Sequence, residues 1–327
     1  MEVPSRWSDS TAPGSTARGW ASRNPWLVAG LVLLALLLAF PLLPSSGDSD
    51  DPGDDPGDDL SDDLSDDLSD GVLRLPRSLH ELSGMVALDA HTLACVQDEL
   101  GVVYLVDLRG QKPVRSVPFG KDGDYEGIAM VAGAIWVLRS DGKLSRLVWG
   151  GESLIVDQTY KLPFEGEFEG LCYDANSNQL LVLPKGPVDG KRREQERRRV
   201  FAFDVQRAQA MEKPKVTLQV DEIEKQIEAR ALPAPRRTTA KGNQRVELRL
   251  YGSELLALPG GDLLMLSPKD HLLLRLNRAG NVVTTQELNM ALLPQPEAMA
   301  LLPDGRLLIG SEGRDGPALI VVVAIPQ

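Results

Sequence analysis

The stretch Phe168-Glu169-Gly170-Leu171-Cys172 is one of three short acidic signatures that each open a run of strand-like segments. The other two read Asp124-Tyr125-Glu126-Gly127-Ile128-Ala129 and Gln295-Pro296-Glu297-Ala298-Met299-Ala300. Two weaker copies extend the series, Glu81-Leu82-Ser83-Gly84-Met85 and Tyr251-Gly252-Ser253-Glu254-Leu255. From glutamate to glutamate, the steps along the chain are 45, 43, 85 and 43 residues. A repeat of roughly 40 to 50 residues with about four short strands is typical of a β-propeller.

Apolar and β-branched runs between turn residues predict an antiparallel meander in each unit. The second unit shows the pattern, with runs at Ile128–Val131, Ala134–Leu138, Leu144–Val148 and Leu154–Thr159. After the last signature only three such runs fit. The apolar run Val72–Leu75, which precedes the first signature, is therefore expected to supply the missing strand and to close the ring.

The step of 85 residues between the third and fourth units leaves two possibilities, one unit with insertions or a degenerate extra unit. Four strand-like runs already follow Glu169, and Asp221–Arg230 then has the apolar spacing of a helix. A loop rich in Pro and Arg continues through Gly242. We therefore expect an all-β, five-bladed β-propeller over residues 72–327, with six blades as the alternative.

The segment Trp26–Leu43 is 18 residues long, rich in Leu and free of charge, which is just enough to cross a bilayer as a helix. Arginines precede it, and every charged residue that follows for more than 20 positions is acidic. This asymmetry predicts a single transmembrane anchor over 26–43, with residues 1–25 in the cytoplasm and the propeller outside. The alternative is that this segment is a cleaved signal peptide. The small residues Ser45-Ser46-Gly47 would then form the cleavage site.

Residues 44–71 form a predicted acidic, disordered linker. Twelve Asp and no cation fall between Asp48 and Asp70, so this segment accounts for the whole net charge of −12 and leaves the remainder balanced. Such a run cannot bury a core and repels itself into an extended tether. Its Asp spacing does not match an EF-hand loop. The overall acidity thus says little about what the propeller binds.

The basic run Lys191–Arg199 lies between two predicted strands and has no aromatic neighbours for stacking on bases. We therefore expect a solvated loop and no nucleic acid partner, with contact to anionic lipid or to the acidic linker as the lesser alternative. Cys95 and Cys172 fall in units that are not neighbours in a five-membered ring, so each is predicted to be a buried free thiol. The three histidines show no zinc-ligand spacing.

The repeated glutamates are the candidate site. Rotation about a propeller axis relates equivalent positions of the blades, so Glu126, Glu169 and Glu297 are expected at one end of the central channel. Gathered carboxylates repel one another unless a cation or protons neutralise them, and oxygen-only ligands suit Ca²⁺. Glu81 is added as a fourth candidate metal ligand. The alternative is that these glutamates accept hydrogen bonds from strand amides, or form salt bridges with Lys185 or an Arg, and join the blades. The further candidates for ligand contacts at the channel mouth are Asp98, Glu99, Lys185 and Glu312.

The motifs FEGLCYD, QLLVLPKGP, DYEGIAM and QPEAMALLPDGRLLIGSEG resemble the repeated signatures of the SdiA-regulated (YjiK-like) proteins. The resemblance covers about residues 72–327. It implies a membrane-tethered bacterial propeller of five blades, distantly similar to NHL-repeat proteins, with a bound calcium ion and no established catalytic activity. The sequence departs from the family pattern at Ser253-Glu254, where a Ser-Gly pair is common, and at Ala298, where Gly is usual.

Together these features favour a calcium-containing binding or scaffolding module of the bacterial cell envelope. The expected location is the inner membrane, single-pass, with a periplasmic or extracytoplasmic propeller. Its expected partners are the membrane itself and an unknown envelope protein or small ligand. The alternative is a calcium-dependent hydrolase of lactonase, phosphoesterase or phytase type, which rests on fold analogy alone. No Asn stands beside the glutamate signatures, and Lys185 is the only cation next to a plausible mouth position.

Overall fold

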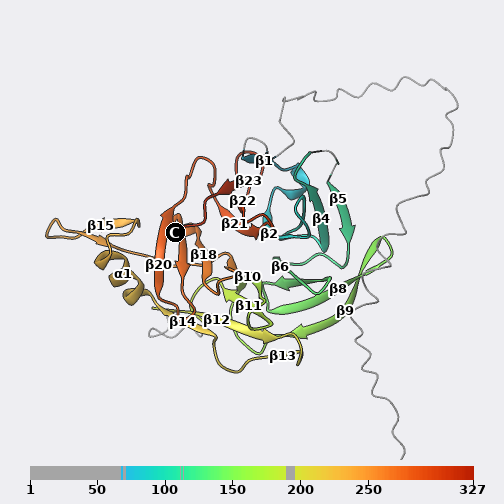
Figure 1. The fold of residues 1–327 in the computed structure, drawn as a ribbon, viewed down its shortest axis with the longest axis horizontal. Helices are drawn as coiled ribbons and strands as arrows, with labels where there is room; N and C mark the ends of the chain where they lie inside the picture. Colours follow the sequence, from blue (N-terminus) through green and yellow to red (C-terminus); the bar gives the residue numbers. More distant parts are fainter. Residues whose placement is uncertain (1–67, 69–70, 111, 113, 189–195) are drawn as a thin grey trace, which may run out of the picture. The chain divides into compact units, whose positions relative to one another are not determined.

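The computed structural model describes residues 68, 71–110, 112, 114–188 and 196–327. Five antiparallel sheets of four or five strands are arranged as a ring (Figure 1), and a sixth sheet has two strands. The innermost strands of neighbouring sheets contact one another in the order β2, β6, β10, β17, β21 and back to β2. This closed series of contacts defines a five-bladed β-propeller, as the repeat spacing predicts.

The blades follow the chain. Blade 1 contains β2 (Leu82–Ala87), β3 (Thr92–Gln97), β4 (Val102–Asp107) and β5 (Arg115–Pro118). Blade 2 contains β6 (Tyr125–Val131), β7 (Ala134–Arg139), β8 (Lys143–Gly150) and β9 (Ser153–Lys161). Blade 3 contains β10 (Phe168–Asp174), β11 (Gln179–Pro184), β12 (Arg197–Asp204), β13 (Gln209–Ala210) and β14 (Val216–Gln219). Blade 4 contains β17 (Leu255–Ala257), β18 (Leu263–Ser267), β19 (Leu272–Leu276) and β20 (Val282–Glu287). Blade 5 contains β21 (Pro296–Leu301), β22 (Leu307–Ser311), β23 (Leu319–Val323) and β1 (Val72–Arg74).

The ring closes where the two ends of the propeller meet. Strand β1 pairs with β23 in antiparallel register, with Leu73 opposite Ile320. Leu73 is buried, and both residues belong to the same buried cluster. The predicted closing strand is thus confirmed. It covers the outer edge of blade 5, which would otherwise expose unpaired backbone groups.

Additional segments within blade 3 and between blades 3 and 4 account for the step of 85 residues between Glu169 and Glu254. Helix α1 (Val220–Ala229) buries Ile223 and Ile227 in the cluster shared by blades 3 and 4. A two-stranded hairpin of β15 (Arg236–Thr238) and β16 (Gln244–Val246) follows, in the segment for which the sequence predicts a loop. The carboxylate Oε1 of Glu228 accepts a hydrogen bond of 2.9 Å from the Val246 N–H. The insertion is therefore packed against the propeller, and no sixth blade forms.

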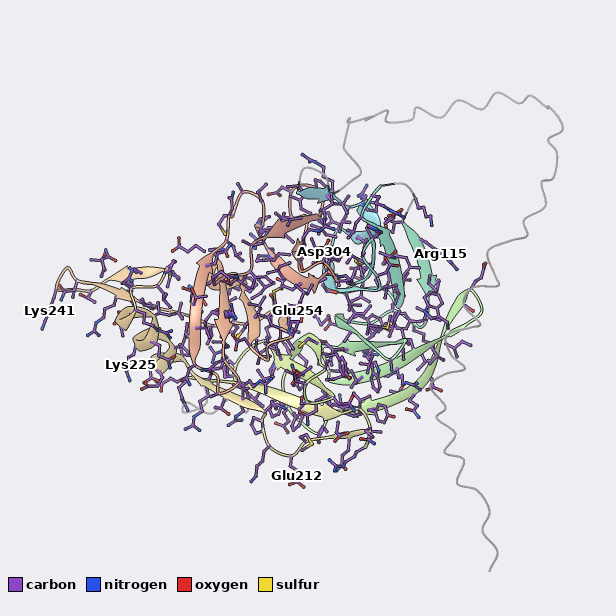
Figure 2. The ribbon with its side chains drawn as sticks, in the orientation of Figure 1. Arg115, Glu212, Lys225, Lys241, Glu254 and Asp304 are labelled. Carbon is purple, nitrogen blue, oxygen red and sulfur yellow. The ribbon has the colours of Figure 1, made fainter. Side chains whose placement is uncertain are left out.

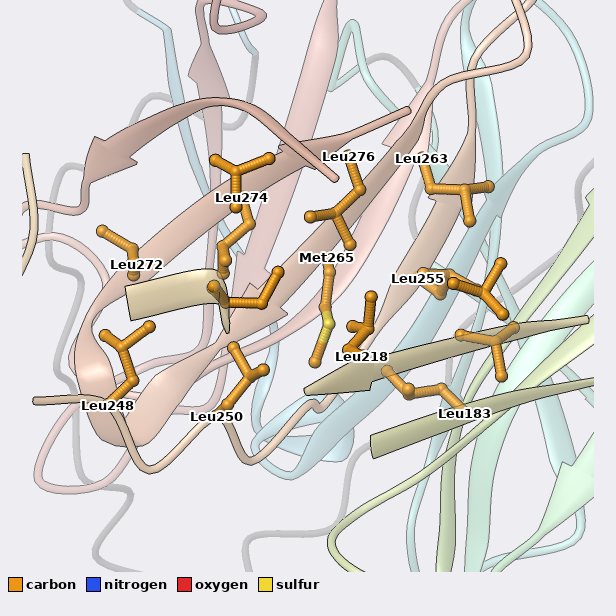
Figure 3. Packing of buried hydrophobic residues seen from close by; sticks show 14 of the residues in the cluster. Leu183, Leu218, Leu248, Leu250, Leu255, Leu263, Met265, Leu272, Leu274 and Leu276 are labelled. Atoms are coloured by element: carbon orange, nitrogen blue, oxygen red, sulfur yellow. The ribbon is translucent and has the colours of Figure 1, made fainter. Parts of the chain in front are cut away.

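Buried aliphatic side chains hold adjacent blades together. Figure 3 shows one such cluster, in which Leu183 and Leu218 of blade 3 pack with Leu255, Met265 and Leu274 of blade 4. At about 25 cal/mol per Å² of apolar area, layers of this kind are the main source of stability in the fold. They fix the angle between blades and thereby the spacing of whatever the innermost strands carry.

A bulge recurs at the start of the innermost strands. The strand register shifts between Leu82 and Gly84, and the same shift occurs in β6, β10 and β21. In these four strands the residue after the bulge is small, Gly84, Gly127, Gly170 or Ala298, because neighbouring blades approach closely there. A Cβ atom on Gly127 would lie 2.7 Å from Leu171 Cβ. The repeated Glu-Gly pair is therefore a bulge residue followed by a residue at a close contact between blades.

No helix among the described residues is long and apolar enough to cross a membrane. The predicted anchor over 26–43 lies outside the described part of the chain, as does nearly all of the predicted linker over 44–71. Leu68, at the end of that linker, is buried, and its N–H donates to the Leu108 carbonyl at 3.0 Å.

Two shorter 3₁₀ helices complete the described structure, η2 (Arg77–Leu79) before blade 1 and η3 (Pro268–Asp270) between β18 and β19. Cys95 and Cys172 are both free and buried, as predicted. Burial raises the pKa of the Cys95 thiol to about 12 and that of Cys172 well above its usual value.

Candidate functional site

The bulge residues form a ring at one end of the channel, which we call the bulge ring. Its five members come from equivalent positions at the start of the innermost strands, with Ser253 just before β17, and are Ser83, Glu126, Glu169, Ser253 and Glu297. The assignment of Ser253 rests on its backbone bonds, since its N–H and the carbonyl of Glu254 both pair with Leu266. Three of the five positions therefore carry a carboxylate, and these are the three strongest candidates from the sequence.

In the two weaker signatures the glutamate does not occupy the bulge position. Ser83, and not Glu81, occupies the bulge position of blade 1. Glu81 lies two residues earlier, where its carbonyl accepts the Asp98 N–H at 3.3 Å. In blade 4, Glu254 takes the place that Gly occupies in three other blades, one residue after the bulge.

The remaining candidates lie just outside the bulge ring, after the second strand of their blades. The N–H groups of Asp98, Lys185 and Glu312 donate to carbonyls at the start of the first strands, at 3.3, 2.9 and 3.0 Å respectively. Ser140 has the same position in blade 2. Glu99 follows Asp98 by one residue. The further candidates from the sequence thus surround the same channel end as the bulge ring.

The two serines of the bulge ring link blades directly. Ser83 Oγ donates to the Tyr125 carbonyl of blade 2 at 2.6 Å, and Ser253 Oγ donates to the Pro296 carbonyl of blade 5 at 2.9 Å. Glu254 makes a similar link, because its Oε1 accepts the Leu171 N–H of blade 3 at 3.0 Å. Figure 2 shows Glu254 near the centre of the ring. The joining role that the sequence left open for its glutamates is therefore filled by Glu254.

Glu169 forms the one ion pair of the three bulge carboxylates within the described chain. Lys185 Nζ lies 2.5 Å from Glu169 Oε1. The carboxylate is 9% exposed and the lysine side chain 50% exposed, so the pair joins a buried charge to a group that reaches solvent. One cation thus serves three neighbouring carboxylates, and the site has an excess of acid.

The carboxylates resist ionisation. Burial raises the pKa of Glu126 to about 9, and the charges of Glu169 and Asp124 add to this effect. Burial also raises the pKa of Glu297 to about 8, again with Glu169 contributing. The pKa of Glu169 is raised by burial although Lys185 opposes the shift. At neutral pH, without a further cation, this arrangement favours the protonated form of Glu126 and Glu297.

The outer acids follow the same pattern to a smaller degree. Burial raises the pKa of Glu312 to about 7, with Asp98 and Glu81 adding to it, and that of Asp98 to about 6. The carboxylate of Asp124 accepts a hydrogen bond from Ser140 Oγ. Acidic groups therefore extend over the whole channel end, beyond the bulge ring itself.

The donor chemistry of this channel end suits Ca²⁺, since every ligand on offer is an oxygen. The arrangement is not yet that of a closed metal centre. Within the described ranges no three acidic, His or Cys side chains lie close enough to hold a metal ion. The Lys185 ammonium stands beside Glu169, where a cation would have to compete with it. Binding of Ca²⁺ would therefore require Lys185 to turn away and Glu126 and Glu297 to give up their protons.

A pocket of about 360 Å³ opens beside the bulge ring, between blades 3, 4 and 5. Glu169 and Glu297 lie on its inner side, and Tyr251 and Met290 are partly exposed on its wall. No pattern in the sequence indicates this pocket, because its residues come from six separate segments. The full lining comprises Glu169, Lys185, Tyr251, Gly252, Ser253, Pro268, Lys269, His271, Met290, Pro294, Gln295, Glu297 and Arg314.

The remainder of the channel is apolar. A cavity of about 290 Å³ is lined by the innermost strands of all five blades, with Met85, Met130 and Met299 among its side chains. A charged ligand at the acidic end therefore meets a hydrophobic barrier along the axis. The candidate polar and charged groups are therefore confined to one end of the channel.

No family model matches the sequence, and no curated protein matches it either. Solved structures do match the fold. Glutaminyl cyclase from Myxococcus xanthus is 17% identical, covers 77% of this chain and 97% of its own, and has a TM-score of 0.48. A putative oxidoreductase (glucose dehydrogenase) from Thermus thermophilus is 13% identical, covers 77% and 99%, and has a TM-score of 0.47. Virginiamycin B lyase from Staphylococcus aureus is 12% identical, covers 78% and 88%, and has a TM-score of 0.43. These likenesses concern the fold, and at such identities they transfer no activity.

Proposed function

We propose that this protein is a binding module of β-propeller fold, which takes its ligand at the acidic channel end and holds Ca²⁺ there through Glu126, Glu169 and Glu297. The observation that carries the proposal is the bulge ring. Three carboxylates, one buried and two partly buried, occupy rotationally equivalent positions, and a single lysine is ion-paired with one of them. Structural joining alone does not require three acids, since serine performs it at the other two positions.

A divalent cation would offset the burial and the repulsion that raise the pKa values of these groups. Ca²⁺ accepts six to eight oxygens in a flexible arrangement, so water and outer carboxylates can complete its shell. Glu81, Asp98, Glu99 and Glu312 surround the same end and are the candidates for that supplement. Because a metal ligand must be deprotonated, Ca²⁺ affinity should rise with pH.

The test is calorimetric titration of Ca²⁺ into the chelator-treated full-length chain in detergent. A Glu126→Gln/Glu169→Gln double variant keeps side-chain size and removes two charges from the bulge ring. The matched control is Glu152→Gln/Glu222→Gln, which removes two exposed carboxylates elsewhere. We expect saturable binding by the wild type and by the control, and loss of binding in the first variant. Absence of binding by the folded wild type would contradict the proposed Ca²⁺ site.

The membrane part of the proposal rests on Trp26–Leu43 and on the resemblance to the SdiA-regulated (YjiK-like) proteins. We infer a single-pass inner-membrane protein whose propeller lies in the periplasm, with a protein or small ligand of the envelope as its partner. After alkaline carbonate extraction the chain should stay with the membranes, and protease added to spheroplasts should degrade the propeller. Release of an intact propeller by carbonate would contradict the anchor.

One observation supports the hydrolase alternative. Glu312 and Glu297 lie at the same channel end with pKa values of about 7 and 8, in the range where a carboxyl group can act as general acid or base. Lactones and phosphoesters tested with Ca²⁺ present would decide between the two functions. Turnover lost in Glu297→Gln and retained in the exposed-site control would favour the enzyme.

A further inference from the structure

We propose that the pocket beside Glu169 and Glu297 binds a small organic anion, with one carboxylate or phosphate group on an apolar body. This inference rests on the proposed function only in taking the channel end as a binding site, and it does not require Ca²⁺. Three features of the pocket support it: a cationic rim, an unpaired buried nitrogen and an exposed apolar wall.

The rim carries two cations from different blades. Lys269 belongs to η3 in blade 4, and its side chain has no hydrogen bond or ion pair with any described residue. Arg314 follows β22 of blade 5 and donates from Nε to Gln295 Oε1 at 2.8 Å, without a salt bridge to any described carboxylate. Both residues are exposed. A charged ligand entering from solvent therefore meets these two cations first.

The inner side of the pocket does not cancel this charge. Glu169 is already paired with Lys185. The lining as a whole has three permanent cations, Lys185, Lys269 and Arg314, against two carboxylates. A lysine–carboxylate pair offers an incoming anion a further N–H donor, because the ammonium has three hydrogens. The pocket is thus suited to an anion, although the channel end beside it is acidic.

His271 supplies an unsatisfied donor or acceptor in the same lining. Its Nδ1 is buried and has no hydrogen-bond partner. Its backbone is held in the left-handed region, with φ of 50°, by the end of η3. Buried polar atoms without a partner are rare, and one beside a pocket indicates a missing water or ligand atom. The position of the histidine is fixed by its backbone, since its carbonyl accepts the Leu288 N–H at 2.8 Å.

The exposed wall of the pocket is apolar and suits a ligand with an apolar body. Tyr251 is 38% exposed and Met290 is 42% exposed, and both line the pocket. The Tyr251 ring is kept in place by the Arg198 guanidinium, which lies 5.2 Å from the ring centroid. Arg198 in turn donates from Nε to the Leu250 carbonyl at 2.7 Å. A rigid aromatic face beside two cations is a common design for holding an aromatic or aliphatic acid.

The size of the cavity agrees with this class. About 360 Å³ lies at the lower end of the range for small-molecule sites, roughly 300 to 1,000 Å³. It accommodates a ring or short chain with one acidic group. A polymer would have to extend out of the pocket, and the proposal does not include one.

The experiment uses three probes of similar size on the full-length chain in detergent, with chelator present. Phenylacetate carries a carboxylate, phenyl phosphate carries a phosphate, and 2-phenylethanol is the neutral control. Binding is followed by ligand-observed NMR and by calorimetry. We expect saturable binding of at least one anion, and at least about tenfold weaker binding of the alcohol, because the alcohol cannot form charge-assisted hydrogen bonds with the two cations. The stronger of the two anions identifies the acid type.

Variants locate the site. Lys269→Gln/Arg314→Gln should weaken anion binding by about tenfold or more, whereas Lys213→Gln/Arg278→Gln, which removes two exposed cations elsewhere, should leave it unchanged. Tyr251→Ala should weaken all three probes alike. Thermal unfolding of each variant checks that it is folded.

Three results would overturn the proposal: no saturable binding of either anion, equal binding of the alcohol, or full binding by the folded rim variant. Because chelator is present throughout, a failure here is separate from a failure of the calcium site. Conversely, anion binding without any response to Ca²⁺ in the earlier titration would leave this inference standing and remove the metal.

Discussion

Glu254 offers the sharpest test of how this channel end is built. The residue is 1% exposed. Its Oε1 accepts N–H groups from Leu171 at 3.0 Å and Leu255 at 2.7 Å, while Oε2 is buried without a partner. Burial raises its pKa well above the usual value of 4.5, and the charges of Glu169 and Glu297 act in the same direction. We expect Glu254→Gln to be more stable than the wild type at pH 8.

The sign follows from the protons bound in each state. The unfolded chain releases the proton of Glu254 as pH rises through about 4.5, whereas the folded chain keeps it. The contribution of this group to stability is therefore fully present below pH 4.5 and declines above it, by up to about 1.4 kcal/mol per pH unit, until the raised folded pKa is reached. Glutamine keeps the oxygen that accepts the Leu171 N–H and does not titrate. The advantage of the variant should thus grow with pH.

Glu254→Ala provides the contrast. It removes the titration and also leaves the Leu171 N–H without its acceptor, which costs roughly 1 to 3 kcal/mol in addition to the cavity. Urea unfolding at pH 5 and pH 8, with chelator present and tryptophan fluorescence as the signal, gives the three stabilities. A Glu254→Gln variant that is less stable than wild type at pH 8, or a difference that does not change between the two pH values, would refute this reasoning.

Three further predictions concern the fold. Gly127→Ala places a methyl group 2.7 Å from a side-chain carbon of the next blade and should cost roughly 1 to 3 kcal/mol in urea unfolding, whereas Gly316→Ala, with nothing within 4 Å, should cost less than about 0.5 kcal/mol; equal costs would contradict the close approach of the blades. Cys95 and Cys172 should react with a thiol reagent only after denaturation, and a disulfide found by non-reducing mass analysis would contradict their assignment as free. Leu73→Asp puts an unpaired charge in the closing strand and should lower stability by about 3 kcal/mol or more, so an unchanged melting temperature would argue against closure by that strand.

The arrangement of blades could be predicted because its signals are local. Apolar runs such as Ile128–Val131 and turn residues recur at the blade period, and the missing strand of blade 5 has an obvious counterpart in Val72–Leu75. The helix at 220–229 was equally visible, from Ile223 and Ile227. The hairpin of β15 and β16 was not, because its short strands are rich in Arg and Gln and are mostly exposed.

The candidate site was predictable only in part. A bulge inserts one residue into a strand, so counting from Glu to Glu misplaces the register where the signature is weak. For this reason Glu81 and Glu254 appeared equivalent to Glu126, whereas Ser83 and Ser253 hold that position. The role of Lys185 beside Glu169 was among the alternatives from the start.

The pocket itself could not be predicted from the sequence. Tyr251, Lys269 and Arg314 lie on three separate loops, and only the closure of the ring brings them together. No short-range pattern relates such residues. The calcium site remains a proposal, because the chemistry of its donors and not their present spacing supports it.

A crystal structure grown with Ca²⁺ tests the central claim most directly. The proposal predicts a peak of anomalous density at the acidic channel end, with carboxylate oxygens of Glu126, Glu169 and Glu297 at roughly 2.3 to 2.6 Å. It also predicts that Lys185 has turned away from Glu169. Crystals with ample Ca²⁺ that show no such peak, and Lys185 still paired with Glu169, would contradict the claim.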